Sequence, residues 1–324
     1  MLTQRQQREL YDKLVERFGR TIGDAFFEAI QNAATNVSIA QLEDAINRND
    51  LRALEMLLRL EQGALFPVSE AIRSAFIGGG LSAGTIISRG QFGFDGRHYR
   101  AEAWVRENAG TLVQGIETQT LEMLRTVMEN RVATGESGAK TARAIVGTYN
   151  RATGRREGGF LGLTSQQTDA AIRARAELGN LDANYFTRKL RDKRFDRMVQ
   201  KAIDAGKPLS AADIDRIIRG YNSKQLRYRG ELIARTEARA AISSGQYEGL
   251  TQAVERGATI TAKWIHGGSR EPRFDHLAMD ESPPRLLGQP FIMADGTALR
   301  YAHDPQAPIR HRAGCKCSMF FRVV

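Results

Sequence analysis

Cysteine is scarce in this sequence: only Cys315 and Cys317 occur among its 324 residues. A disulfide between thiols one residue apart would be strained, and thiols in the cytosol are mostly reduced. We therefore do not expect a fold stapled by disulfides. The two cysteines are either thiols packed in a core or ligands of a bound group.

Long apolar runs are equally absent. None approaches the roughly 18 residues that a membrane span needs, and the charged residues 1–20 lack the apolar stretch of a signal peptide. Mean hydropathy is −0.40 and 42% of the residues are hydrophobic, as in ordinary soluble proteins. We expect no membrane partner, and synthesis and use in a bacterial-type cytoplasm or inside a particle assembled there.

The motifs of common enzyme classes are missing too. The sequence has no G-x-S-x-G, H-E-x-x-H or P-loop pattern. Arg235 and Glu237 lie two positions apart, so on a helix they do not face each other, and we expect each to pair with a neighbouring element. The chain ends at Val324, directly after the C-terminal module, so we expect no appended catalytic domain. The prediction is that the protein is not an enzyme.

A nuclease- or transferase-like effector is the alternative. It would use the histidines, cysteines and aspartates near the C-terminus, where Asp275 directly precedes His276. A histidine beside a carboxylate can act as a general base.

Positive charge is present in excess, and it is concentrated in the middle of the chain. The formal net charge is +10, while residues 140–230 alone carry 20 Lys/Arg and nine Asp/Glu, a net charge of +11. Such a segment is typical of proteins that meet a polyanion. A solvated helical face that contacts an acidic protein would give the same count, and the sequence favours neither interpretation.

The densest basic run extends from Tyr185 to Lys201. Its cations are the candidate contacts with double-stranded DNA, bound without sequence preference: Arg188, Lys189, Arg191, Lys193, Arg194, Arg197 and Lys201. The interleaved aromatic residues could stack on bases. Apolar residues at helical spacing favour a core role for these aromatics, with the charges outside.

Apolar periodicity and capping patterns predict a mainly helical protein. Ser38, Thr164 and Ser210 each open a capping box, and a long helix is expected from about Ser223 to Arg256. Seven glycines within residues 78–98 favour a flexible connection. We predict a helical arm over residues 1–77, a glycine-rich linker over 78–98, a basic helical body over 99–222 and a C-terminal domain over 223–324.

The C-terminal domain changes pattern. Residues 259–265 alternate in polarity and predict a strand, and residues 318–324 predict a second strand. The last strand could pair beside the strand that contains Trp264. The fold class is therefore mainly α with a small C-terminal α+β module.

Four of the five histidines and both cysteines fall within the last 59 residues. Zn²⁺ prefers such ligands in tetrahedral geometry, although C-x-C is a weaker signal than C-x₂-C. The candidate ligands are His276, Cys315 and Cys317, with His311 or His303 as a fourth. The alternative is a purely structural cluster in which the cysteines pack and His276 hydrogen-bonds the turn.

The same segment resembles the Mu F-like head-morphogenesis family of tailed phages. The resemblance covers about residues 225–320 and rests on an ordered set of short motifs. They are the helix start Glu231-Leu-Ile-Ala-Arg-Thr-Glu237, Lys263-Trp264, Arg270, Arg273, Asp275-His276, Pro290-Phe291, Asp304-Pro305 and His311-Arg-Ala-Gly-Cys-Lys-Cys317. Ala313-Gly314 stands where the family usually has an asparagine, and residues 277–280 replace its L-D-G. Neither departure removes a histidine or cysteine, but both weaken the claim that this turn needs an asparagine.

The resemblance implies a minor capsid protein of the phage head. Such a protein would partner the portal protein and capsid or scaffold proteins, and it would touch packaged double-stranded DNA. Its place would be inside the virion head near the portal vertex, and the host cytoplasm during assembly. A DNA-binding regulator is a further alternative, but the sequence has no recognisable helix-turn-helix or zinc finger.

Overall fold

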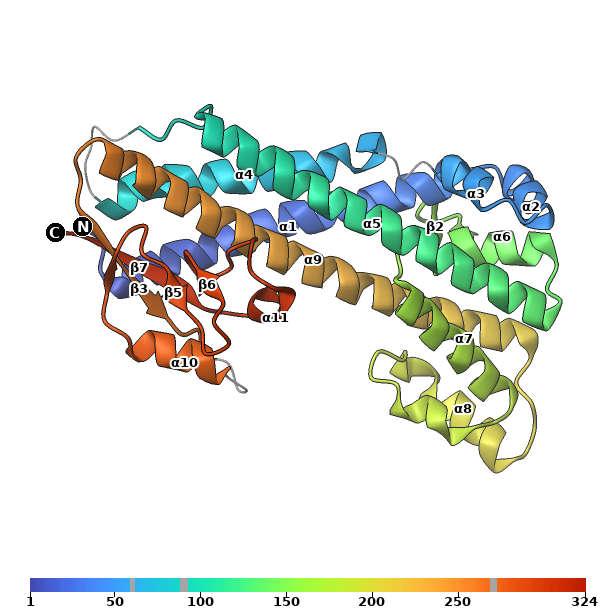
Figure 1. Ribbon diagram of the computed structural model, residues 1–324. Helices are drawn as coiled ribbons and strands as arrows, with labels where there is room; N and C mark the ends of the chain where they lie inside the picture. The colour runs from blue at the N-terminus through green and yellow to red at the C-terminus, as the bar shows by residue number, and fades with distance from the viewer. Residues whose placement is uncertain (59–61, 88–92, 269–272) are drawn as a thin grey trace. The chain divides into compact units, whose positions relative to one another are not determined.

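Helices dominate the protein, as predicted. The computed structural model describes residues 1–58, 62–87, 93–268 and 273–324 (Figure 1). Four long helices carry the fold: α1 (Gln4–Asn36), α4 (Gln62–Ile87), α5 (Tyr99–Thr134) and α9 (Ala211–Glu255). Short strands are gathered mainly near the C-terminus. The predicted fold class, mainly α with a small C-terminal α+β module, is confirmed.

The chain divides into two compact units, and each is assembled from segments that are distant in sequence. Unit 1 contains residues 1–25, 67–111 and 231–324, and unit 2 contains residues 26–66 and 112–230. Each division falls inside one of the four long helices, so these helices contribute residues to both units. The sequence predicted consecutive segments instead.

Unit 2 holds several shorter helices and one hairpin. They are α2 (Ile39–Asn47), α3 (Leu51–Leu58), α6 (Gly138–Val146), β1 (Thr148–Asn150), β2 (Arg155–Glu157), α7 (Ser165–Gly179), the 3₁₀ turns η1 (Ala183–Thr187) and η2 (Lys193–Phe195), and α8 (Asp196–Asp204). The helix starts follow the capping patterns. Ser38 accepts a hydrogen bond from the backbone N–H of Gln41, and Thr164 forms a full capping box with Gln167.

Unit 1 ends in the α+β module. It contains β3 (Ile260–Ile265), α10 (Phe274–Glu281), β4 (Arg285–Leu286), β5 (Phe291–Ile292), β6 (Ala298–Leu299), α11 (Ile309–Arg312) and β7 (Ser318–Val323). The main sheet has the order β4-β3-β7 and is antiparallel. Trp264 lies opposite Met319, so the predicted pairing of the last strand beside Trp264 is confirmed.

The prediction of a flexible linker at residues 78–98 is wrong for its first half. Gly78, Gly79 and Gly80 lie inside α4, while residues 88–92, with Gly90, lie outside the described residues. A Cβ on Gly79 would come within 2.4 Å of the Ile242 carbonyl oxygen, and one on Gly245 within 2.0 Å of the Phe76 carbonyl oxygen. These glycines allow the backbones of α4 and α9 to approach closely within unit 1.

Two predicted helices also prove to be one. The capping pattern at Ser210 and the long helix expected from Ser223 both belong to α9, which continues from Ala211 to Glu255. Ser210 accepts a hydrogen bond from the backbone N–H of Asp213. No proline interrupts this stretch, so the backbone hydrogen bonds can continue throughout. Within the described ranges, no helix has the length and apolarity to cross a bilayer.

Candidate metal centre

The pairing of β3 with β7 brings the cysteines to the segment that follows β3. Ile265, the last residue of β3, lies opposite Ser318, the first residue of β7. Cys317 directly precedes β7. A Cβ on Gly267 would lie 2.1 Å from the Lys316 carbonyl oxygen, so glycine is required where the two segments pass. The helix α10 packs against β3 and supplies His276.

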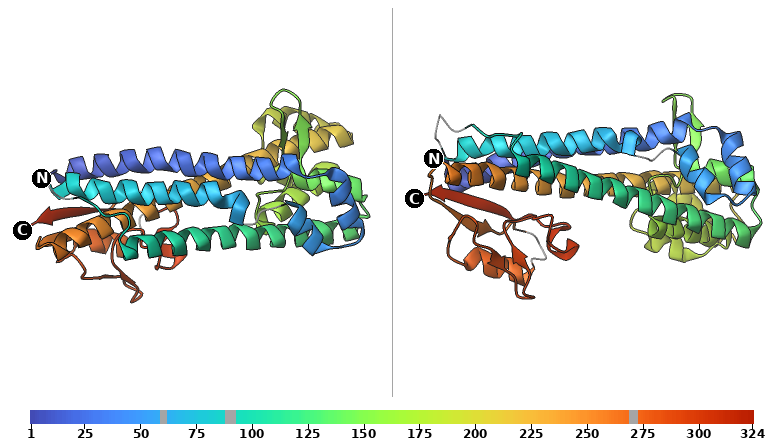
Figure 2. Two further views of the ribbon diagram at one scale, coloured as in Figure 1. Left: turned by 90° about the horizontal axis from the view of Figure 1, so that it is seen from above. Right: turned by 45° about the horizontal axis from the view of Figure 1, so that its top comes forward.

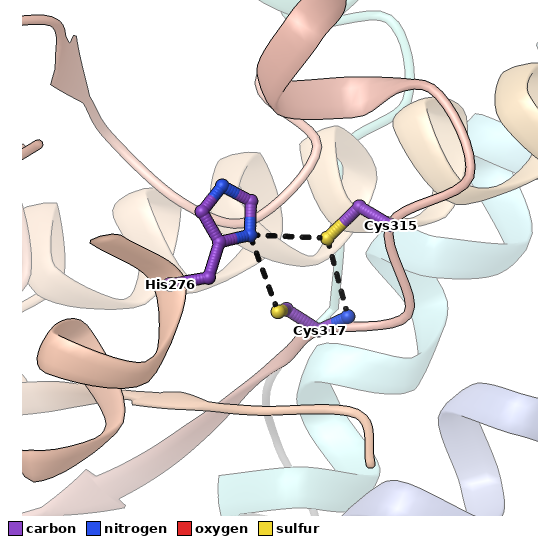
Figure 3. Close-up of side chains that lie close together, drawn as sticks. All are labelled: His276, Cys315 and Cys317. Carbon is purple, nitrogen blue, oxygen red and sulfur yellow. Dashed lines mark hydrogen bonds between the residues drawn. The ribbon is translucent and has the colours of Figure 1, made fainter. Parts of the chain in front are cut away.

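His276, Cys315 and Cys317 converge on one point (Figure 3). The Nδ1 atom of His276 lies 3.5 Å from the sulfur of Cys315 and 3.5 Å from the sulfur of Cys317. All three side chains are buried, with exposed fractions of 1%, 4% and 2%. Their ligand atoms lie within 4.8 Å of one another, so the group can hold a metal ion.

A chain of hydrogen bonds orients the His276 ring. Its Nε2 atom lies 3.4 Å from Nδ1 of His311, and Nε2 of His311 lies 3.0 Å from a carboxylate oxygen of Asp295. An ionised carboxylate only accepts hydrogen bonds, so Nε2 of His311 donates to Asp295. The geometry allows Nε2–H of His276 to donate to Nδ1 of His311. In that tautomer Nδ1 of His276 presents a lone pair to both sulfurs, as metal binding requires.

The charge on Asp295 is stabilised by this chain. The hydrogen bond from His311 lowers the pKa of the Asp295 carboxyl below its ordinary range, and contacts with Thr297 and Arg310 act in the same direction. Trp264 packs edge-on against the His276 ring, with ring centroids 5.2 Å apart. A hydrogen-bonded far nitrogen and a packed ring are what a metal-binding histidine usually has.

The predicted fourth ligands lie elsewhere. His311 contacts the nitrogen of His276 that faces away from the sulfurs, and Nε2 of His303 lies 3.0 Å from the Cys317 carbonyl oxygen. Burial lowers the pKa of His303 to about 4, so its ring is neutral and donates to that carbonyl. Among the described residues, the ligand group contains His276, Cys315 and Cys317.

The two thiols are electrostatically different. Their mutual hydrogen bond lowers the pKa of Cys315 and raises the pKa of Cys317, and His276 lowers that of Cys315 further. The backbone N–H of Cys317 also points to the Cys315 sulfur at 3.4 Å. The Cys315 sulfur is therefore the one that ionises more easily to the negative thiolate, which is the form that binds a metal.

Arginines fix the turn that carries the cysteines. Arg239 of α9 donates to the Cys315 carbonyl oxygen, and Arg273 donates to the Ala313 carbonyl oxygen at 2.6 Å. The sequence analysis missed Arg239 and Asp295. Arg239 lies eight residues, about two helical turns, after Glu231 in the first motif, and that spacing was the available signal. Asp295 lies in a loop, where no periodic pattern marks it.

The motifs that carry the family resemblance meet in this module. Burial raises the pKa of Glu237, opposed by the charge of Arg312 from α11. Arg235 pairs with Glu231 of its own helix at 3.8 Å, not with another element as expected. Asp304 binds Arg300 at 2.8 Å. Arg270 lies outside the described residues.

The predicted DNA contacts divide into two groups. Arg188 binds Glu177, Arg191 binds Asp196, and Arg194 binds Asp192 in ion pairs of 2.6 to 2.9 Å. The exposed cations without an acidic partner in the described part of the chain are Lys189, Lys193, Arg197 and Lys201. Tyr185 is fully buried, in accord with the expected core role.

Comparison with known proteins gives no relative: no family model, curated protein or solved structure matches the chain.

Proposed function

We propose that this protein is a minor head protein of a tailed phage, which acts in head morphogenesis near the portal. The observation that carries the proposal is that three of the motifs, Lys263-Trp264, Asp275-His276 and His311–Cys317, meet at the cluster of His276, Cys315 and Cys317. The order of the motifs in the sequence is that of the Mu F-like family.

We propose Zn²⁺ as the ion of the metal centre. Tetrahedral zinc with bonds of about 2.0 Å to nitrogen and about 2.3 Å to sulfur places these atoms about 3.5 Å apart. Both nitrogen–sulfur distances here are 3.5 Å. A single Nδ1 lone pair can accept only one well-directed hydrogen bond, so two equidistant sulfurs favour a shared ion. The burial of the ligands favours a structural ion, and the fourth position of the tetrahedron has no protein ligand among the described residues.

Metal analysis tests the ion. Purified protein should carry about one zinc per chain, and the Cys315→Ser/Cys317→Ser variant should lose it because its hydroxyls are poor zinc ligands. His266→Gln serves as the matched control, since His266 lies in the same module but outside the ligand group. Folded wild-type protein without metal would rule out the zinc proposal.

The proposed partners are the portal protein, capsid or scaffold proteins, and packaged double-stranded DNA. The net charge of +11 in residues 140–230 supports the DNA contact, because lysine and arginine bind phosphate independently of sequence. The proposed location is the inside of the head near the portal vertex, and the host cytoplasm during assembly.

Fractionation of virions tests the function. Gradient-purified particles of the phage that encodes this chain should contain it in few copies relative to the major capsid protein. It should remain in the particle after a protease treatment that removes exposed proteins. Its absence from particles, together with its presence in the host extract, would overturn the proposal.

A further inference from the structure

Several arginines of unit 2 that lack an acidic partner among the described residues lie at the hairpin β1–β2, outside the densest basic run. Residues 143–158 contain four arginines and one acidic residue, whereas residues 177–204 contain seven cations and five acidic residues. The one acid of the hairpin, Glu157, accepts hydrogen bonds from Asn150 and Thr153. Glu157 therefore stabilises the hairpin tip through these hydrogen bonds and does not pair with an arginine.

The arginines themselves contact neutral groups. Arg155 donates to the side-chain oxygen of Gln31, and Arg156 donates to the Gly147 carbonyl oxygen at 3.1 Å. Arg151 is exposed at the tip. In the part of the chain that the structure describes, these three have no carboxylate within 4.0 Å. The hairpin extends beyond the helices beside it (Figure 2), which leaves its positive charge accessible to a large ligand.

A cleft of about 160 Å³ opens at the base of the hairpin, lined by Gly147, Thr148 and Gly158 together with residues of α5, α6, α7 and α9. Its lining includes four cations and two acidic residues. Lys140 pairs with Glu136 and Arg175 pairs with Asp215, each at 2.6 Å. Arg143 and Arg219 keep their charges uncompensated within the described residues.

One buried polar atom at this wall has no partner among the described residues. Asn222, which is 2% exposed, lines the cleft and donates to the Gly158 carbonyl oxygen, while its own Oδ1 accepts nothing. Such an atom is rare in a folded protein because leaving it unpaired costs about 1–3 kcal/mol. It indicates that the cleft holds a polar ligand with its bound water.

The size of the cleft decides the class of ligand. The cleft volume of about 160 Å³ is smaller than the roughly 300 Å³ at which small-molecule sites begin. A phosphate group suits a cleft of this size better than a whole nucleotide does. Arginine is suited to phosphate because its planar guanidinium can donate two parallel hydrogen bonds.

We propose that the hairpin–cleft surface, formed by Arg143, Arg151, Arg155, Arg156 and Arg219, binds the phosphate backbone of duplex DNA. One phosphate sits in the cleft between Arg143 and Arg219, and the hairpin tip contacts neighbouring phosphates. The proposal rests on the proposed function for its ligand. It assigns the DNA contact to a surface other than the predicted run of residues 185–201.

Fluorescence anisotropy with the full chain and a labelled duplex of arbitrary sequence tests this assignment. Two double variants remove charge from the hairpin–cleft surface: Arg151→Gln/Arg155→Gln at the tip and Arg143→Gln/Arg219→Gln in the cleft. Each should lower affinity about tenfold and reduce the slope of log K against log salt by about 0.9 per lost phosphate contact. The control, Lys207→Gln/Arg227→Gln, removes the same charge from exposed positions of unit 2 and should stay within about threefold.

Three outcomes overturn the assignment. The first is that both hairpin–cleft variants, folded by circular dichroism, bind like wild type. The second is that Lys189→Gln/Lys193→Gln causes the larger loss, which moves the contact to residues 185–201 and leaves the proposed function intact. The third is that inorganic phosphate binds the cleft but wild-type protein does not bind duplex. Virion fractionation tests the proposed function independently of these three outcomes.

Discussion

Single hydrogen bonds decide which histidine of the C-terminal module can bind a metal. His276, His303 and His311 are all buried, and the sequence analysis named His276 as a primary ligand with His311 or His303 as a fourth. Their hydrogen-bond partners differ: His303 bonds to the Cys317 carbonyl oxygen, and His311 bonds to Asp295. Only His276 directs a nitrogen at both cysteines.

The first prediction concerns Asp295. His311 and His276 connect its carboxylate to the cysteine sulfurs through successive hydrogen bonds. Asp295→Asn should lower zinc affinity about 10- to 100-fold, because an amide no longer holds His311, and hence His276, in the required tautomer. Competition with a chromophoric chelator measures the affinity. Glu281→Gln, at an exposed position of α10, is the control. Equal affinities for the two variants would show that the chain of hydrogen bonds does not act on the metal.

At the residue scale, the sequence predicted the three ligands but not their surroundings. Clustering of histidine and cysteine identified His276, Cys315 and Cys317 because residue type alone limits the choice of ligand. The role of His311 depends on which nitrogen faces which neighbour. That orientation follows from the stacking of the His311 ring of α11 on the His276 ring of α10, and no pattern in the sequence encodes it.

At the scale of elements, the glycines of α4 and α9 serve close packing. Gly245 and Gly249 lie one turn apart in α9, and both face the backbone of α4 near Gly80. The sequence analysis interpreted the glycines of residues 78–80 as a flexible connection because glycine is a common breaker. Gly245 and Gly249 lie four residues apart within a predicted helix. That spacing was the sequence signal for close helix packing in place of a flexible connection.

The second prediction compares two glycines in helices of unit 1. Gly245→Ala should lower the free energy of unfolding by about 1–3 kcal/mol, because the added methyl group meets the Phe76 carbonyl oxygen. Gly110→Ala in α5 meets nothing within 4 Å and should raise stability by about 0.5–1 kcal/mol. Thermal denaturation followed by circular dichroism measures both. Equal shifts for the two variants would contradict the packing role.

The third prediction concerns Asp192, which joins the turn η2 to α9. Its buried carboxylate accepts hydrogen bonds from Arg194 and from Lys224 of α9. The hydrogen bond from Arg194 chiefly lowers the pKa of Asp192 to about 2 from 3.8. A depressed carboxyl pKa stabilises the fold above the unfolded value, and this contribution is lost as pH falls towards 2.

Asp192→Asn should therefore cost about 2 kcal/mol of unfolding free energy at neutral pH and about half of that at pH 3. Urea denaturation at the two pH values measures the difference. Asp204→Asn, at an exposed position of α8, removes the same charge and should have little effect at either pH. A cost that does not change with pH would mean that Asp192 acts through packing alone.

At the scale of the whole molecule, the sequence predicted the elements better than their grouping. Capping residues such as Ser38 and Thr164 mark helix starts because their hydrogen bonds are local. The two compact units are instead built from segments far apart in the chain. Contacts between α4 and α9 join residues more than 150 positions apart, and composition along the chain carries no information about them.

The last prediction follows from the continuity of the helices. Because α1, α4, α5 and α9 each contribute residues to both units, unfolding one unit removes backbone hydrogen bonds at the ends of helices that enter the other. Helix formation is cooperative, so we expect one unfolding transition. Both tryptophans, Trp104 and Trp264, lie in unit 1, so their fluorescence reports on that unit alone. The Asp192→Asn variant destabilises unit 2, yet it should shift the fluorescence midpoint as far as the circular dichroism midpoint. A fluorescence midpoint that stays at the wild-type value would show that the two units unfold independently.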